Sequence, residues 1–140
     1  MLTRERGSVL ILMPAAVLIV LTLAAITMDL SLVHLGRREL VAAVEASAND
    51  AATYGLDEGA YRRGSGYAID PARAHRAVVQ SLHARGVLDD LVQPPTILIG
   101  GTTIEVSLSM QVDYVFARAL PGGPHHTTVS ATGSATAVPR

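Results

Sequence analysis

The longest feature in the pattern of hydrophobic and polar positions is an uninterrupted apolar run near the N-terminus. Residues 7–28 carry no charged side chain, and they lie between Arg4 and Arg6 on one side and Asp29 on the other. An α-helix rises 1.5 Å per residue, so these roughly 22 residues reach about 33 Å, enough to cross the hydrocarbon core of a bilayer. The run predicts a transmembrane helix over residues 7–28.

Two other interpretations of the run stay open. A cleaved secretory signal needs a positive start, an apolar centre and small residues before the cut, and Arg4, Arg6 and the small side chains within residues 22–27 can supply these. A buried core helix would also be apolar, but a chain of 140 residues offers too little core to wrap such a helix on all sides. The length of the run favours a retained span.

The charges that flank the run indicate its orientation. Arg4 and Arg6 lie directly before it, whereas Arg37 and Arg38 follow about two turns after its end. Positive charge concentrates on the cytoplasmic side of membrane helices, and the adjacent pair carries more weight. We therefore expect a cytoplasmic leader over residues 1–6 and an extracytoplasmic C-terminal part. The residues expected at the membrane boundary are Arg4, Arg6, Asp29, Arg37 and Arg38.

After Asp29 the pattern changes from uniformly apolar to amphipathic. Apolar residues recur at helical spacing, with charged and polar residues elsewhere around the cylinder. The apolar positions are Val33, Leu40, Val44, Ala48 and Ala51. Gly36 is the one weak point, at a cost of about 1 kcal/mol relative to Ala. We expect one continuous helix from near Ser8 to near Tyr54, ended by Gly55, with residues 29–54 as its extracytoplasmic continuation.

A second, shorter helix follows a glycine-rich stretch. Residues 55–68 hold four glycines and several charges, which is typical of a flexible loop. Asp70 can then cap a helix, Pro71 suits its first position, and Gly86 can close its end in the left-handed conformation. An apolar stripe between them predicts an amphipathic helix docked on a core. The stripe consists of Ala74, Val78 and Leu82.

After residue 95 the spacing of apolar residues changes from a helical period of 3.6 to the period of 2 that is typical of a strand. Residues 96–99 form a short β-rich run, Gly100-Gly101 is a two-residue hairpin signal, and residues 103–116 alternate between polar and apolar side chains. Residues 127–138 alternate again. The sequence predicts an α+β fold, in which residues 55–140 form a small exported domain. Its antiparallel sheet of three or four strands would have its apolar face covered by both helices.

Composition and charge reduce the range of possible functions. The formal net charge is −1, so there is no electrostatic case for binding nucleic acid. Cysteine is absent, which excludes a disulfide framework and thiol chemistry. Only one Phe and no Trp are present, so the core must consist of Val, Leu, Ile and Ala. A chain of this length accommodates one small domain and an anchor.

No pattern predicts catalysis, a metal or a cofactor. The histidines lack metal-ligand spacing, no serine lies in G-x-S-x-G, and the glycine pairs lack the spacing and the lysine of a phosphate loop. The histidines are His34, His75, His83, His125 and His126. We expect Asp29 to be a solvated acid at the membrane interface, the alternative being a buried intramembrane acid with a function.

The first fifty residues resemble the N-terminal segment of the TadE/TadG-like proteins, minor pilins or pseudopilins of the tight-adherence (Flp-type) pilus system. The shared elements are a short basic leader ending in Gly7-Ser8, an apolar helix with Met13-Pro14, then Asp29, an Arg-rich patch, and an alanine-rich helix. The Arg-rich patch is Arg37-Arg38-Glu39-Leu40, and the alanine-rich helix covers residues 42–52. The Ser/Thr/Ala alternation of residues 127–138 agrees in kind with the small terminal sheet of that family, so the resemblance implies a pilin-like fold.

The resemblance implies a subunit or accessory factor of pilus assembly that acts by helix packing, with the bilayer and other pilin or assembly subunits as partners. In the TadE branch a peptidase cuts after the leader Gly, which here would fall between Gly7 and Ser8. The family's Glu five residues into the mature chain is Leu12 here, which favours the permanently anchored TadG-like branch. The alternative is a membrane-tethered exported module that binds a surface ligand or partner unrelated to pili.

Overall fold

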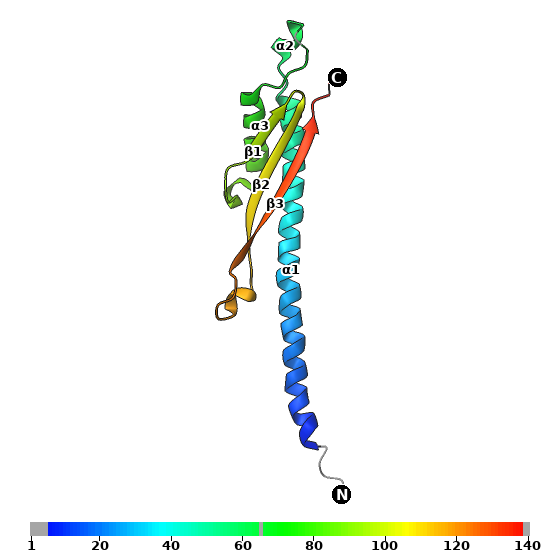
Figure 1. The fold of residues 1–140 in the computed structure, drawn as a ribbon, viewed down its shortest axis with the longest axis vertical. Coiled ribbons are helices and arrows are strands. Elements are labelled where there is room, and N and C mark those ends of the chain that lie inside the picture. The colour runs from blue at the N-terminus through cyan, green and yellow to red at the C-terminus, as the bar shows by residue number, and fades with distance from the viewer. Residues whose placement is uncertain (1–5, 65, 139–140) are drawn as a thin grey trace.

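The fold is α+β, with one long N-terminal helix, shorter helices and a three-stranded antiparallel sheet (Figure 1). The computed structural model describes residues 6–64 and 66–138, and their side chains from residue 12 onward. In chain order the elements are α1 (Arg6–Tyr54), α2 (Glu58–Arg62), α3 (Pro71–Ala84), the 3₁₀ turn η1 (Leu88–Asp90), β1 (Thr96–Gly100), β2 (Thr103–Asp113), the 3₁₀ turn η2 (Ala117–Ala119) and β3 (His126–Thr136).

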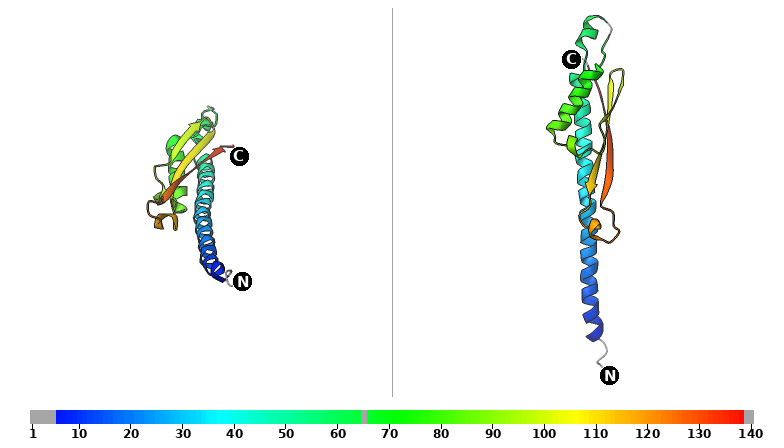
Figure 2. Two further views of the ribbon diagram at one scale, coloured as in Figure 1. Left: turned by 60° about the horizontal axis from the view of Figure 1, so that its bottom comes forward. Right: turned by 90° about the vertical axis from the view of Figure 1, so that its left-hand side faces the viewer.

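Helix α1 is continuous over 49 residues, which confirms the predicted single helix. Its C-terminal half packs against the other elements, whereas its N-terminal half projects away from them (Figures 1 and 2). Asp29 is the first buried residue, and from Gly36 onward burial recurs every three or four residues along one side, as packing on a single face requires. The buried positions of α1 are Asp29, Gly36, Leu40, Ala43, Val44, Ser47, Ala48, Ala51 and Ala52.

Helix α3 begins and ends at the predicted residues. Asp70 Oδ1 accepts hydrogen bonds from the backbone nitrogens of Ala72 (2.8 Å) and Arg73 (3.3 Å), so the expected N-cap is formed. Pro71 occupies the first turn, where its missing N–H is not needed. Gly86 follows the helix with a φ of +71°, the left-handed conformation expected there.

The three strands form a sheet in the order β1-β2-β3, with both pairs antiparallel. The hairpin turn lies one residue later than predicted: Gly100 pairs with Thr103, so the two turn residues are Gly101 and Thr102. Gly101 has a φ of +64°, which explains why a glycine is needed at this turn position. Strand β2 ends at Asp113 and not at the predicted residue 116, and β3 spans His126–Thr136.

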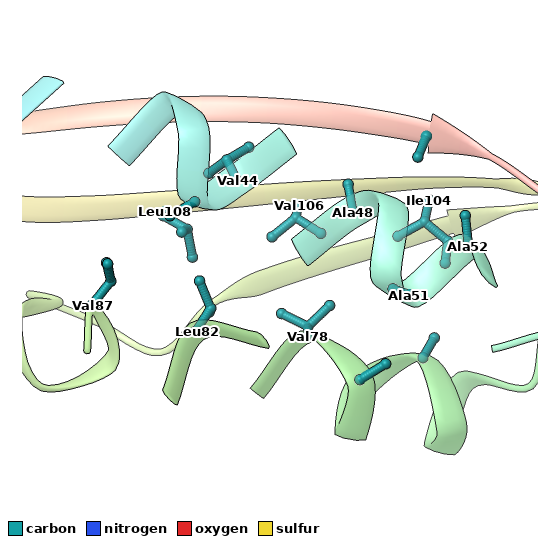
Figure 3. Packing of buried hydrophobic residues seen from close by; sticks show 14 of the residues in the cluster. Val44, Ala48, Ala51, Ala52, Val78, Leu82, Val87, Ile104, Val106 and Leu108 are labelled. Carbon is teal, nitrogen blue, oxygen red and sulfur yellow. The ribbon is translucent and has the colours of Figure 1, made fainter. Parts of the chain in front are cut away.

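The hydrophobic core lies between α1, α3 and the inner face of the sheet (Figure 3). Both helices point small or branched side chains at the inward positions of β2, which confirms that they cover the apolar face together. The central members are Val44, Ala48 and Ala51 of α1, Val78 and Leu82 of α3, and Ile104, Val106 and Leu108 of β2. Aliphatic residues dominate this core, as the scarcity of aromatic residues requires.

The expectation of a flexible loop over residues 55–68 is wrong in part, because the segment contains helix α2. Asp57 Oδ1 accepts a hydrogen bond from the Gly59 backbone nitrogen (2.8 Å) and so caps this single turn. Leu56 pairs with Ile69 in an isolated antiparallel bridge that joins the two ends of the segment. A side-chain cap and a backbone bridge thus give order to a glycine-rich stretch.

Two glycines allow the sheet to approach α1 closely. A Cβ at Gly133 of β3 would overlap with Val44 Cγ1 and lie 3.1 Å from the Glu45 backbone nitrogen. A Cβ at Gly36 of α1 would lie 2.7 Å from Val112 Cγ2. The helix-weakening Gly36 therefore lies where Val112 of β2 crosses α1, and a Cβ at this position would displace the Val112 side chain.

The substitution Gly133→Ala is expected to lower the free energy of unfolding by about 1–3 kcal/mol, because the neighbouring helix backbone cannot move aside. Gly100→Ala is the matched control, since a Cβ there meets no atom within 4 Å. Denaturant unfolding of the whole chain in detergent, followed by circular dichroism, measures both. Equal stability of the two variants would contradict the close helix–sheet contact.

Candidate functional site

The stretch of α1 from residue 12 to residue 28 is an exposed apolar cylinder. From Leu12 to Met28, ten large apolar side chains are each at least 52% exposed, and no part of the described chain covers them. Exposing a single Leu or Ile side chain to water in place of burying it costs about 1.5–3 kcal/mol. Helix α1 is long and apolar enough to be a candidate single membrane span. A cylinder that is apolar on all sides suits lipid.

The hydroxyl groups within this cylinder are satisfied by the helix itself. Thr22 Oγ1 donates to the Leu18 carbonyl, and Thr27 Oγ1 donates to the Leu23 carbonyl, both at 2.8 Å. A hydroxyl that bonds the carbonyl four residues earlier needs no water. The polar groups of the exposed half are therefore compatible with a hydrocarbon environment, where an unsatisfied donor is costly.

Asp29 ends the apolar cylinder, and the expectation that it is solvated is wrong. Its side chain is buried, with the residue only 6% exposed. Oδ1 accepts hydrogen bonds from the backbone nitrogens of Val115 (2.8 Å) and Phe116 (3.1 Å). Oδ2 accepts from Phe116 (3.3 Å) and Ala117 (2.8 Å). Three consecutive N–H groups thus converge on one carboxylate.

These hydrogen bonds determine the charge state of Asp29. Burial raises the pKa of the carboxyl, but the backbone N–H groups of Phe116, Ala117 and Val115 outweigh it, so the net pKa lies below its usual value. Successive backbone N–H groups form an anion-binding concavity, and the ionised carboxylate occupies it. Asp29 is consequently a charged structural group at the point where burial begins on α1.

The Asp29 contact also explains why β2 ends earlier than its alternating pattern predicts. Beyond Asp113 the backbone donors of residues 115–117 turn away from β3 and toward α1. The Tyr114 nitrogen donates to the His125 carbonyl (2.9 Å), which closes the intervening residues into a loop. We call Tyr114–His125 the anchored loop, since Asp29 holds it against α1.

The side of α1 that faces away from the sheet carries shallow grooves. Their lining mixes apolar and charged side chains from two successive stretches of the helix. We call this the outer face of α1, and it consists of Thr27, Leu30, Ser31, His34, Leu35, Arg37, Arg38, Val41, Ala42 and Glu45. Leu30 and Leu35 are 64% and 58% exposed. Within the described chain no other element packs here, so this side can accept another helix.

A polar hollow lies between α1 and α3, lined in part by Asp50, Arg73, Arg76 and Ser81. The Ser81 hydroxyl donates to Asp50 Oδ2 at 2.6 Å. A nucleophilic serine must give its proton to a base that a third group orients, whereas this hydroxyl bonds a carboxylate directly across two packed helices. The pair is best explained as a bond between α1 and α3.

The predicted boundary residues are dispersed along α1. Arg37 and Arg38 are exposed, and they follow Asp29 by about 12–14 Å along the helix axis. Gly7 and Ser8, the expected processing site, lie in the first turns of α1 after Arg6. Arg4 and the rest of the predicted leader lie outside the described residues. No group of three metal-ligating side chains occurs in the described part of the chain.

Comparisons with known proteins identify no relative of this chain. No protein-family model matches the chain, and neither the curated proteins nor the solved structures contain a significant match to it.

Removal of the Asp29 carboxylate is expected to free the anchored loop. In Asp29→Ala the amides of Val115, Phe116 and Ala117 should exchange with solvent at least about tenfold faster, because all three lose a charged acceptor. The exchange rates in Asp29→Asn should lie between those of Asp29→Ala and those of the unsubstituted protein, since asparagine keeps one acceptor oxygen. Hydrogen exchange of the whole chain in detergent measures this. Asp89→Asn, in the exposed η1 turn, is the control. Equal protection in all variants would contradict the Asp29 clamp, by which we mean the hydrogen bonds from the N–H groups of residues 115–117 to the Asp29 carboxylate.

The hydrogen bonds that form the Asp29 clamp should also depend on pH. A carboxyl whose pKa is lowered in the folded state contributes stability above its unfolded pKa of about 4, and that contribution is lost as pH falls through the lower, folded value. The amide resonances of residues 115–117 should therefore stay constant from pH 7 to about pH 4 and move together below that. A common midpoint at about pH 4 would indicate a solvated acid, and a higher midpoint would indicate a buried acid whose hydrogen bonds do not offset its burial; either result would contradict the contact between Asp29 and the loop.

Proposed function

We propose that the protein is a single-pass membrane-anchored, minor pilin- or pseudopilin-like protein that takes part in assembly of a Flp/Tad-type pilus. The observation that carries the proposal is the division of α1. Its first half presents uncovered apolar side chains on all sides, and its second half is the central helix of a small domain. One rigid helix thus links the bilayer to the exported domain.

The proposed orientation places the N-terminus in the cytoplasm and the domain outside. It rests on the positive residues before the span, Arg4 and Arg6, and on the distance of Arg37 and Arg38 from its end. We propose that the span stays in the membrane. Leu12 stands where the resembled pilins carry the Glu that sets subunit register, so the helix lacks that buried charge and the pairing it would need.

Assembly would use the outer face of α1. Its apolar members Leu30, Leu35 and Val41 are exposed, and the small side chain of Ala42 leaves room for a close helix–helix contact. Charged residues of both signs, Arg38 and Glu45, border the same grooves. This mixture of apolar groups and charged groups of both signs is suited to a specific protein partner.

The second candidate function is a membrane-tethered binding module unrelated to pili. It is favoured by the outward face of the sheet, where hydroxyl groups pair across β2 and β3. Ser107 Oγ lies 2.9 Å from Thr132 Oγ1, and Ser109 Oγ lies 3.0 Å from Ser130 Oγ. This hydroxyl-rich, hydrogen-bonding surface would face a ligand in that case.

Loss of the protein is expected to abolish or shorten surface pili, and Ala42→Trp should fail to restore them because the bulky ring blocks the outer face. Ala72→Trp, an exposed position on α3, is the matched control and should restore them. Electron microscopy of complemented cells gives the pilus count, and immunoblotting of membranes confirms that both variants accumulate. Normal pili in cells without the protein would contradict the proposal.

A further inference from the structure

We infer that the anchored loop, Tyr114–His125, rests on the outer surface of the lipid bilayer and is a second membrane contact of this protein. The inference builds on the membrane placement of α1 under the proposed function. It adds a separate surface, on a different part of the chain, with lipid headgroups and the adjoining acyl region as its partner.

The position of the loop follows from Asp29. The carboxylate that holds residues 115–117 belongs to the residue directly after the apolar cylinder. The loop is therefore fixed at the level where α1 would leave the hydrocarbon. The ribbon shows the same arrangement, with the loop beyond the lower end of the sheet and beside the middle of α1 (Figures 1 and 2).

The side chains of the loop suit an interface. Val115, Phe116 and Leu120 are 45%, 43% and 64% exposed, and Phe116 is the one phenylalanine of the chain. Arg118, also exposed, is the one Asp, Glu, Lys or Arg side chain in the loop. Apolar side chains enter the boundary between headgroups and acyl chains, while an arginine beside them reaches the lipid phosphates.

Placement in lipid accounts for the grouping of three exposed apolar side chains in one short loop. The outward face of the neighbouring sheet carries Ser and Thr hydroxyls, whereas the loop presents large apolar groups beside an apolar helix. The surface is thus continuous with the candidate span and not an isolated patch. Helix α1 and the loop would hold the domain at two points and restrict its tilt relative to the bilayer.

The loop has a defined shape before it meets lipid. The Ala119 nitrogen donates to the Phe116 carbonyl (3.0 Å), and the Gly123 nitrogen donates to the Leu120 carbonyl (2.9 Å). These bonds and the Asp29 clamp restrict the backbone in advance. A preorganised loop loses less conformational entropy on docking, so a few apolar side chains suffice for a stable contact.

Site-directed spin labelling of the whole chain in lipid nanodiscs tests the inference. The sequence contains no cysteine, so Val20→Cys, Phe116→Cys, Leu120→Cys and Leu98→Cys each carry one nitroxide. Collision rates with oxygen, which concentrates in lipid, and with a water-soluble nickel chelate report the depth of each label. Val20 serves as the control for the span, and Leu98, exposed on β1, serves as the control for the distal domain surface.

Labels at Phe116 and Leu120 are expected to show an oxygen-to-nickel ratio at least about threefold above that of Leu98 and below that of Val20. A deep Val20 with Phe116 and Leu120 equal to Leu98 would overturn the inference and leave the anchor intact. Labels at 116 and 120 that are shielded from both reagents would indicate a protein partner, which also overturns it. An aqueous Val20 would instead overturn the proposed function.

A second measurement tests the role of Asp29 in setting the depth. In Asp29→Ala the Leu120 label should lose its raised oxygen-to-nickel ratio and gain mobility, whereas the Val20 label should be unchanged. Asp89→Asn is the matched control. A Leu120 label that keeps its depth in Asp29→Ala would show that the clamp does not position the loop.

Discussion

The rest of the structure depends on a single constraint, that one helix must be stable in two different surroundings. From Asp29 onward α1 buries one face against the sheet and α3, and the protein itself provides the apolar environment. Before Asp29 no described residue provides it. Hydrocarbon would satisfy the second requirement, because it accepts an apolar cylinder on all sides and a helix pairs nearly all of its own backbone groups.

The junction between the two surroundings is built from polar chemistry. Asp29 is ionised, buried and bonded to three successive backbone N–H groups, so it stabilises a loop that would otherwise leave those donors unpaired. Close to this junction Gly36 lets β2 cross α1, and further along Gly133 brings β3 against Val44. The domain is thereby held against the helix by one charged contact and by two close contacts at glycines.

The regular elements could be read from the sequence because their signals are local. The apolar run, the helical spacing after Asp29 and the Asp70–Pro71 start of α3 depend on neighbouring residues, and the structure confirms both helices. The sheet was predicted from the alternation of polar and apolar residues, but its hairpin turn lies one residue later than predicted. Helix α2 was missed because a single capped turn is too short to produce a periodic pattern.

The Asp29 clamp could not have been predicted from the sequence. Asp29 stood out by its position, but its partners are main-chain N–H groups 86–88 residues away, and such groups leave no signature in side-chain type. The same tertiary contact shortened β2, whose alternation continues to Phe116. The outer face of α1 mixes leucines with arginines, and only the packed structure shows which of them remain uncovered.

Membrane fractionation tests the central claim, that lipid surrounds the first half of α1, most directly. Cell membranes are washed with alkaline carbonate, which removes peripheral proteins, and the pellet is then extracted with detergent. The account predicts that the chain stays in the washed pellet with its N-terminal apolar segment intact and dissolves only in detergent. Recovery of the intact chain as a soluble monomer without detergent would contradict it.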